Sequence, residues 1–113
     1  MNKILHIDDE KDIRSIAKLS LQSIGGFEVT SCGSGREALD CIGSVSPDCI
    51  LLDVFMPDLD GPETLREIKK RQGFADIPVI FMTAETGAGE VERLLRLGAI
   101  GVIAKPFNPM QLS

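Results

Sequence analysis

The segment DCILLDVFMPDLDG, residues 48–61, decides the fold. It begins with a short, continuous apolar run, which is typical of a strand that is covered on both faces of a parallel sheet. The run leads directly into a carboxylate, Asp53. Because a charge is costly to bury unless it is paired, an aspartate at the end of such a strand indicates a functional site there.

Strand-like and helix-like segments alternate on both sides of this run. Helices are predicted from apolar spacing and end signals at 12–24, 36–45, 62–72 and 89–98. Strands are predicted at 3–7, 27–31, 48–53, 77–83 and 100–105. This order predicts an α/β fold, in which a doubly wound, five-stranded parallel sheet carries helices on both faces. A fifth helix opens at NPMQ, 108–111, and is truncated at Ser113.

Several helix termini and one helix face can be predicted in more detail. Ser34 with Glu37, and Asp60 with Glu63, have the three-residue spacing of a capping box at a helix N-terminus. The first helix is expected to bury one apolar face. That face contains Ile13, Ile16, Ala17, Leu21 and Ile24.

Length and charge limit the possible functions. A chain of 113 residues fits one domain. Its net charge of −5 argues against nonspecific binding to nucleic acids or acidic membranes. No apolar run approaches the roughly 18 residues that span a bilayer, and the early acidic residues do not fit a signal peptide. We therefore expect a cytoplasmic domain without direct nucleic-acid or membrane contacts.

The three cysteines, Cys32, Cys41 and Cys49, do not form a C-x-x-C pair of the kind that binds metals. An odd number of cysteines in a chain of this size favours a reducing compartment. We expect the three side chains to be small residues of the core, as free cysteines usually are.

Polar side chains follow four of the five predicted strands. They are the acid pair Asp8-Asp9, then Asp53, Thr83 and Lys105. Since parallel strands end at one edge of a sheet, these side chains should converge there, where open α/β sheets bind ligands. Converging carboxylates repel one another and need a cation, and ligands that are all oxygen suit Mg²⁺. With the Lys105 charge and the Thr83 hydroxyl, the sequence predicts a cradle for a phosphoryl group.

These residues resemble those of a known family. The acid pair after the first strand, LLDVFMPDLDG at 51–61, MTA at 82–84 and KPF at 105–107 are similar to the receiver domain of two-component response regulators. The resemblance covers essentially the whole chain, so that 1–113 would be one receiver domain without an output domain of its own. It implies a flavodoxin-like sheet with the strand order 2-1-3-4-5.

The resemblance also implies the chemistry of the site. Asp53 would be the phosphoacceptor, a carboxylate nucleophile that takes a phosphoryl group from a histidine of a sensor histidine kinase or a histidine phosphotransfer protein. Mg²⁺ would be held by Asp8, Asp9, Asp53 and the backbone carbonyl of Phe55. The domain would thus be a phosphoprotein of phosphorelay signal transduction. It would catalyse no reaction beyond its own phosphorylation and dephosphorylation.

Further residues would bind the phosphate or tune its lifetime. By the resemblance, Lys105 would pair with the phosphate and the Thr83 hydroxyl would move to bond it. Phe55 and Glu85 would tune the phosphoryl lifetime, with Phe55 shielding the site from water and Glu85 orienting a water. Val102 stands where many receivers carry an aromatic switch residue, so switching through an aromatic side chain is not expected here.

Two other functions are weaker alternatives. A phosphatase of the haloacid-dehalogenase type needs a second aspartate two residues after the nucleophile, where this chain has Phe55. A receiver-like scaffold that is never phosphorylated usually lacks an acid or the lysine, and this chain has them all. Because the fifth helix is cut short, we also expect more chain beyond Ser113, either the rest of this helix or a covalently linked output domain.

Overall fold

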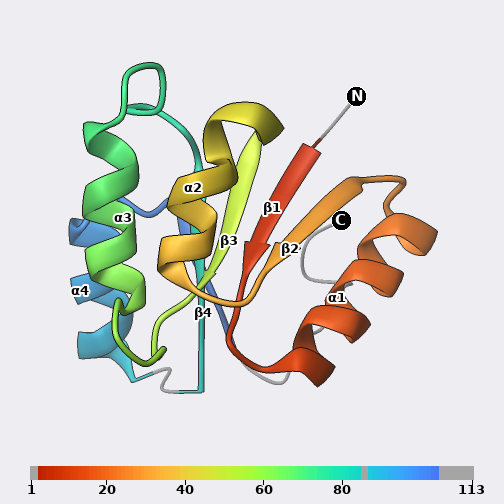
Figure 1. Cartoon of the computed structure of the whole chain (residues 1–113). Coiled ribbons are helices and arrows are strands. Elements are labelled where there is room, and N and C mark those ends of the chain that lie inside the picture. The colour runs from red at the N-terminus through yellow and green to blue at the C-terminus, as the bar shows by residue number, and fades with distance from the viewer. Residues whose placement is uncertain (1–2, 85–86, 105–113) are drawn as a thin grey trace.

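The structure, a computed structural model, describes residues 3–84 and 87–104. Strands and helices alternate strictly in this part of the chain (Figure 1). The elements are β1 (Lys3–Ile7), α1 (Lys11–Ile24), β2 (Glu28–Cys32), α2 (Gly35–Val45), β3 (Cys49–Asp53), α3 (Gly61–Lys70), β4 (Val79–Thr83), α4 (Ala88–Arg96) and β5 (Gly101–Ala104).

The five strands form one parallel sheet in the order β2-β1-β3-β4-β5, which confirms the predicted fold class and strand order. The chain moves outward from β1 to β2 and then returns to the other side of β1 for β3. The order therefore reverses between β1 and β3, and open α/β sheets bind ligands beyond the strand ends at such a point. Ile7 pairs with Leu52 here, so the next residues are Asp8 and Asp53.

The two faces of the sheet have separate cores. Helices α2, α3 and α4 cover one face, and α1 lies on the other (Figure 1). The larger core joins inward residues of three helices to alternate strand residues such as Leu5, Ile50 and Phe81. The smaller core packs Leu21 of α1 against the opposite face. Strands that are covered on both faces explain the continuous apolar run of β3.

Helix α1 differs from the prediction in one respect. Ala17 and Leu21 are buried and Ile13 is half-buried, but the predicted core residue Ile16 is 52% exposed. Residues in a helix are rotated by about 100° from one to the next, so the Ala17–Leu21 row turns Ile16 away from the sheet. Leu19 is also outward, at 66% exposure. The buried face of α1 is therefore narrower than its sequence suggests.

Strands β4 and β5 begin later than predicted. β4 begins at Val79 rather than at 77, directly after Pro78, which has no N–H to donate to a ladder. The described part of β5 spans Gly101–Ala104. The predicted start of the fifth helix, at 108–111, lies outside the described residues. Within the described ranges, no helix is long and apolar enough to cross a bilayer.

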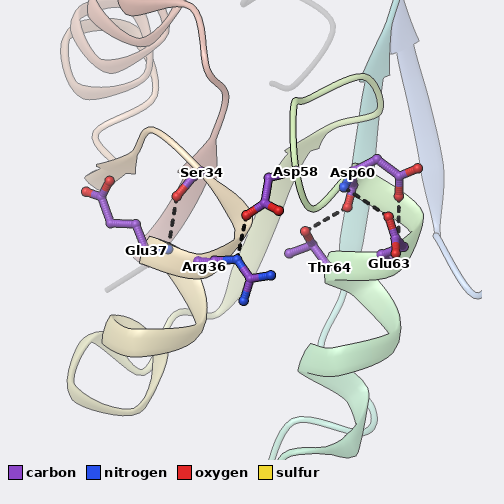
Figure 2. A network of polar contacts seen from close by, with 7 residues as sticks. All are labelled: Ser34, Arg36, Glu37, Asp58, Asp60, Glu63 and Thr64. Carbon is purple, nitrogen blue, oxygen red and sulfur yellow. Dashed lines mark hydrogen bonds and ion pairs between the residues drawn. The ribbon is translucent and has the colours of Figure 1, made fainter.

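The N-termini of α2 and α3 are capped in different ways (Figure 2). At α3 the Asp60 carboxylate accepts from the Glu63 N–H at 2.9 Å, and Glu63 accepts in return from the Asp60 N–H, so the predicted capping box is complete. At α2 the Ser34 hydroxyl accepts from the Glu37 N–H at 3.1 Å. The Glu37 carboxylate, however, accepts from the N–H of Gly33 rather than of Ser34.

Candidate functional site

The candidate site lies at the edge of the sheet where the strands end. Asp8 directly follows β1, Asp53 ends β3 and Thr83 ends β4. These three polar side chains are buried, with Asp8 and Thr83 fully covered and Asp53 only 3% exposed. Strand register places Asp53 beside Met82, one residue before Thr83. The sheet thus brings three of the predicted site residues to adjacent positions on one rim.

Asp8 is held by contacts around both its backbone and its carboxylate. Its N–H donates to the Cys32 carbonyl at 3.0 Å, and its own carbonyl accepts from Arg14 Nη1 at 2.7 Å. The carboxylate Oδ1 accepts from the Glu10 N–H at 2.9 Å, and Oδ2 lies 3.9 Å from Nε2 of the buried His6. These contacts fix the direction of a carboxylate that has no exposed surface.

An acidic cluster surrounds this carboxylate. One oxygen each of Asp8, Asp9 and Glu10 can be chosen so that all three lie within 4.8 Å of one another. Asp9 and Glu10 are exposed. The sequence predicts the acid pair as ligands but not Glu10, which the consecutive run Asp8-Asp9-Glu10 brings into the same group. A buried carboxylate with exposed ones beside it supplies hard oxygen ligands and access to water, a set that fits Mg²⁺ better than zinc.

The segment after Asp53 turns back tightly onto the end of β3. The N–H of Val54 donates to the Met82 carbonyl at 3.1 Å, and its carbonyl accepts from the Gly61 N–H at 2.9 Å. A Cβ on Gly61 would lie 2.8 Å from the Val54 Cα and closer still to the Asp53 carbonyl oxygen. This close approach of two backbones requires glycine at the start of α3. The start of α3 therefore holds in place the backbone at the end of β3, where Asp53 lies.

An ion pair joins the loop that follows Asp53 to α2 (Figure 2). Arg36 Nε donates to the Asp58 carboxylate at 2.5 Å, and the guanidinium holds the pKa of that carboxyl below its usual range. Asp58 adopts a positive φ of 69°, a conformation that aspartate tolerates better than most residues. Both side chains are well exposed, so solvent screens the pair and its contribution to stability is small.

The start of α3 also packs closely against the start of α2. The Thr64 hydroxyl donates to the Asp60 carbonyl at 2.7 Å (Figure 2). A Cβ on Gly35 would collide with that hydroxyl oxygen and would approach the Leu59 side chain to 3.0 Å. The two helix termini are therefore held together next to the loop that follows Asp53.

The other predicted site residues have different surroundings. The Phe55 side chain is 55% exposed, so it stands at the surface two residues after Asp53. Val102 is half-buried in β5, opposite Phe81 of β4, and packs against the larger core. Lys105 and Glu85 lie outside the described residues.

Comparisons with known proteins agree with this arrangement. A family model for the response regulator receiver domain matches residues 4–113. The probable transcriptional regulator ycf27 of Guillardia theta is 40% identical over 110 residues, or 97% of this chain and 42% of that protein. The response regulator SaeR of Staphylococcus aureus is 35% identical over 112 residues, or 99% of this chain and 47% of that protein.

A solved structure gives the same result for the fold. The chemotaxis response regulator CheY4 of Vibrio cholerae superimposes with a TM-score of 0.91 at 34% sequence identity, over 99% of this chain and 92% of that one. The five-stranded parallel sheet with acidic residues at its carboxyl edge thus places the chain among α/β domains of the response regulator type. The chain belongs to the family of response regulator receiver domains of two-component phosphorelay signalling. It spans less than half the length of the two curated relatives named above.

Proposed function

We propose that this receiver domain accepts a phosphoryl group on Asp53 from a phosphohistidine of a partner protein. The observation that carries the proposal is the position of Asp53. It is a nearly buried carboxylate at the end of β3, one residue beyond the Ile7–Leu52 pair and thus beside the acidic cluster that follows β1. Membership of the receiver family supports this assignment.

The proposed transfer needs a nucleophile and a leaving group. A carboxylate oxygen of Asp53 attacks the phosphorus, and the bond between phosphorus and the histidine nitrogen breaks, with the electron pair remaining on that nitrogen. Burial leaves few water molecules around Asp53, which favours attack by the carboxylate over hydrolysis of the donor. Since Phe55 stands where a phosphatase of the haloacid-dehalogenase type needs an aspartate, this chain supplies no general acid at that position.

Mg²⁺ is the proposed cofactor. Asp8, Asp9, Asp53 and the Phe55 carbonyl are the proposed ligands, and the close grouping of Asp8, Asp9 and Glu10 supports an oxygen site for a hard cation. When bound, the ion offsets negative charge on the transferring phosphoryl group and orients it. Glu10 adds a carboxylate through which a bound water could be held.

Thr83 and Lys105 are the proposed phosphate partners. The role of Thr83 is supported by its position, since it is buried at the end of β4, one residue beyond the register partner of Asp53. Phe55 and Glu85 are the proposed lifetime-tuning residues. Val102 is aliphatic and packs against the core, so the response to phosphorylation is proposed to proceed without an aromatic side chain moving at that position.

The partners follow from the same chemistry. A sensor histidine kinase or a histidine phosphotransfer protein would supply the phosphoryl group in the cytoplasm. The curated relatives are more than twice as long as the matched region, which supports an output domain linked covalently to this receiver domain, itself proposed to occupy 1–113. The receiver domain itself is proposed to contact neither nucleic acid nor membrane directly.

The test is phosphorylation in solution. The protein is incubated with acetyl phosphate and Mg²⁺, and intact mass is measured together with the sensitivity of the product to hydroxylamine, which cleaves acyl phosphates. We expect a gain of one phosphoryl group that hydroxylamine removes. Omission of Mg²⁺ should greatly slow the reaction.

Two variants localise the modification. Asp53→Asn should abolish phosphorylation and keep the fold, because it removes charge from a repulsive cluster without changing side-chain size. Asp58→Asn, an exposed carboxylate in the loop after β3, is the matched control and should be phosphorylated like the unmodified sequence. Acid-stable phosphate on Asp53→Asn would show that the phosphoacceptor is assigned wrongly. If neither the unmodified protein nor Asp58→Asn were phosphorylated, the scaffold function would be favoured.

A further inference from the structure

Two of the three cysteines form a pair that the predicted site does not use. Cys32 ends β2 and Cys41 lies in α2, nine positions further along the chain, and their sulfur atoms are 3.4 Å apart. A disulfide bond is about 2 Å long, so the sulfurs need to move together by little more than an ångström. The sequence predicts three separate core cysteines, because spacing alone does not reveal the contact between β2 and α2.

The two thiols differ in their access to solvent. Cys32 is 2% exposed and belongs to the larger core, whereas Cys41 is half-buried and packs at the edge of that core. Cys41 Sγ also lies 3.6 Å from the Ala38 carbonyl, to which its thiol donates. A small solute therefore reaches Cys41 first, with Cys32 behind it within hydrogen-bonding distance.

We propose that Cys32 and Cys41 form a reversible intramolecular disulfide when the domain meets a hydroperoxide such as hydrogen peroxide. The Cys41 thiolate attacks one peroxide oxygen, the O–O bond breaks, and Cys41 becomes a sulfenic acid with release of hydroxide. Cys32 sulfur then attacks Cys41 sulfur, the S–O bond breaks, and the departing hydroxide leaves as water with the Cys32 proton. In total two thiols are oxidised and one peroxide is reduced to two waters. A dithiol reverses the bond by exchange.

The crosslink would join elements that are already packed together. Ala38 and Ile42 of α2 share the larger core with Cys32, so closing the bond requires no rearrangement of the fold. A crosslink of this kind restricts the unfolded chain and should raise the melting temperature. The Cys32 carbonyl also accepts the Asp8 N–H at 3.0 Å, so the bond would anchor the strand that supports the acidic cluster.

Cys49 provides an internal control. Cys49 begins β3, whereas Cys32 ends β2, so in a parallel sheet the two cysteines lie at opposite ends of the strands. Cys49 is half-buried, as Cys41 is, but within the described residues its thiol contacts no other sulfur in the way that Cys41 contacts Cys32. Peroxide should therefore leave Cys49 as a free thiol under conditions that crosslink the pair.

The experiment uses the whole chain after complete reduction. The protein is titrated with hydrogen peroxide, remaining thiols are blocked with N-ethylmaleimide, and peptides are mapped by mass spectrometry without reduction. We expect two of the three thiols to be lost together, a peptide that joins Cys32 to Cys41, and a monomer on a non-reducing gel. The melting temperature should rise on oxidation and return to its starting value with dithiothreitol.

Two variants test whether the Cys32–Cys41 pair forms the disulfide and causes the rise in melting temperature. Cys49→Ser should behave like the unmodified sequence, and Cys41→Ser should form no intramolecular disulfide and show no oxidative rise in melting temperature. Cys41 is chosen because it is half-buried, so that its replacement by a polar serine disturbs the core less than the same change at the buried Cys32. A disulfide that includes Cys49, a crosslink between two molecules, or a sulfinic acid at Cys41 without crosslinking would overturn the proposal.

Discussion

Gly61 lies directly against the backbone of Asp53. A Cβ at residue 61 would overlap the Asp53 carbonyl oxygen and would lie 2.8 Å from the Val54 Cα and 3.1 Å from the Phe81 ring. The first residue of α3 and the last residue of β3 are thus in contact without any side chain between them. The position of the proposed phosphoacceptor depends on this contact between backbones.

Replacing Gly61 with alanine should therefore destabilise the domain. The added methyl group meets backbone atoms that cannot rotate away, and overpacking of this kind costs about 1–3 kcal/mol. Urea unfolding measures the loss. The matched control is Gly43→Ala in α2, where a Cβ meets nothing within 4 Å and alanine should stabilise by roughly 0.5–1 kcal/mol. Equal effects of the two substitutions would contradict the contact.

The capping box of α3 gives a second prediction. Asp60→Ala removes the acceptor for the Glu63 N–H and should lower the free energy of unfolding by about 1 kcal/mol. Asp60→Asn is the control, because asparagine caps helices about as well as aspartate and should retain most of the stability. Both are compared by denaturant midpoint. If both variants lost stability equally, the charge of Asp60 rather than its cap would be responsible.

The Arg36–Asp58 pair predicts a titration that can be followed residue by residue. Because the guanidinium lowers the pKa of Asp58, Arg36→Ala should raise that pKa toward its ordinary value, as measured by NMR. Lys70→Ala, which removes an exposed pair with Glu67 elsewhere on α3, should leave Asp58 unchanged. The lowered pKa means that the pair stabilises the fold above the unfolded-state pKa of Asp58. Its contribution is lost as pH falls through the folded-state value.

Alkaline unfolding should report the burial of Cys32. Burial, and then the hydrogen bond with Cys41, raise the pKa of Cys32 from 9.0 to about 12. The folded state keeps a proton that the unfolded chain releases, so the stabilisation is complete below pH 9 and is lost as pH rises toward 12. The loss is at most about 1.4 kcal/mol per pH unit.

The measurement compares urea midpoints across this pH range for the reduced protein and for Cys32→Ala. The chain has no tyrosine, so cysteines and lysines dominate this titration range, and lysines are shared by the two proteins. The variant should lose stability less steeply with pH. Parallel slopes would show that the Cys32 thiol ionises normally in the folded domain.

Much of the fold was predictable because its signals are local and repeated. The apolar run before Asp53 requires a strand covered on both faces, and parallel strands must end at one edge, which places Asp53 near Asp8. The exposure of Ile16 was not predictable, because the orientation of α1 depends on how Ala17 and Leu21 meet the sheet. Helical periodicity fixes which residues share a face but not which part of that face touches a neighbour.

The hydrogen-bond partners of individual side chains were harder to predict from the sequence than the fold. Glu37 has the spacing of a capping-box residue, yet its carboxylate accepts from Gly33 rather than from Ser34, one residue further on, because side-chain rotation decides between neighbouring N–H groups. The contact between Cys32 and Cys41 depends on how α2 packs against β2. The first contact depends on a side-chain rotamer and the second on tertiary packing, and a sequence motif encodes neither.

The contacts of Asp8 have a consequence for the thermodynamics of cation binding. The residue is anchored through its N–H, its carbonyl and one carboxylate oxygen to Cys32, Arg14 and Glu10. A ligand that is already ordered loses little conformational entropy when an ion arrives. At the proposed cation site, the free energy of arranging Asp8 would therefore contribute little to the affinity, which would depend more on the number of carboxylate charges at the rim and on ionic strength.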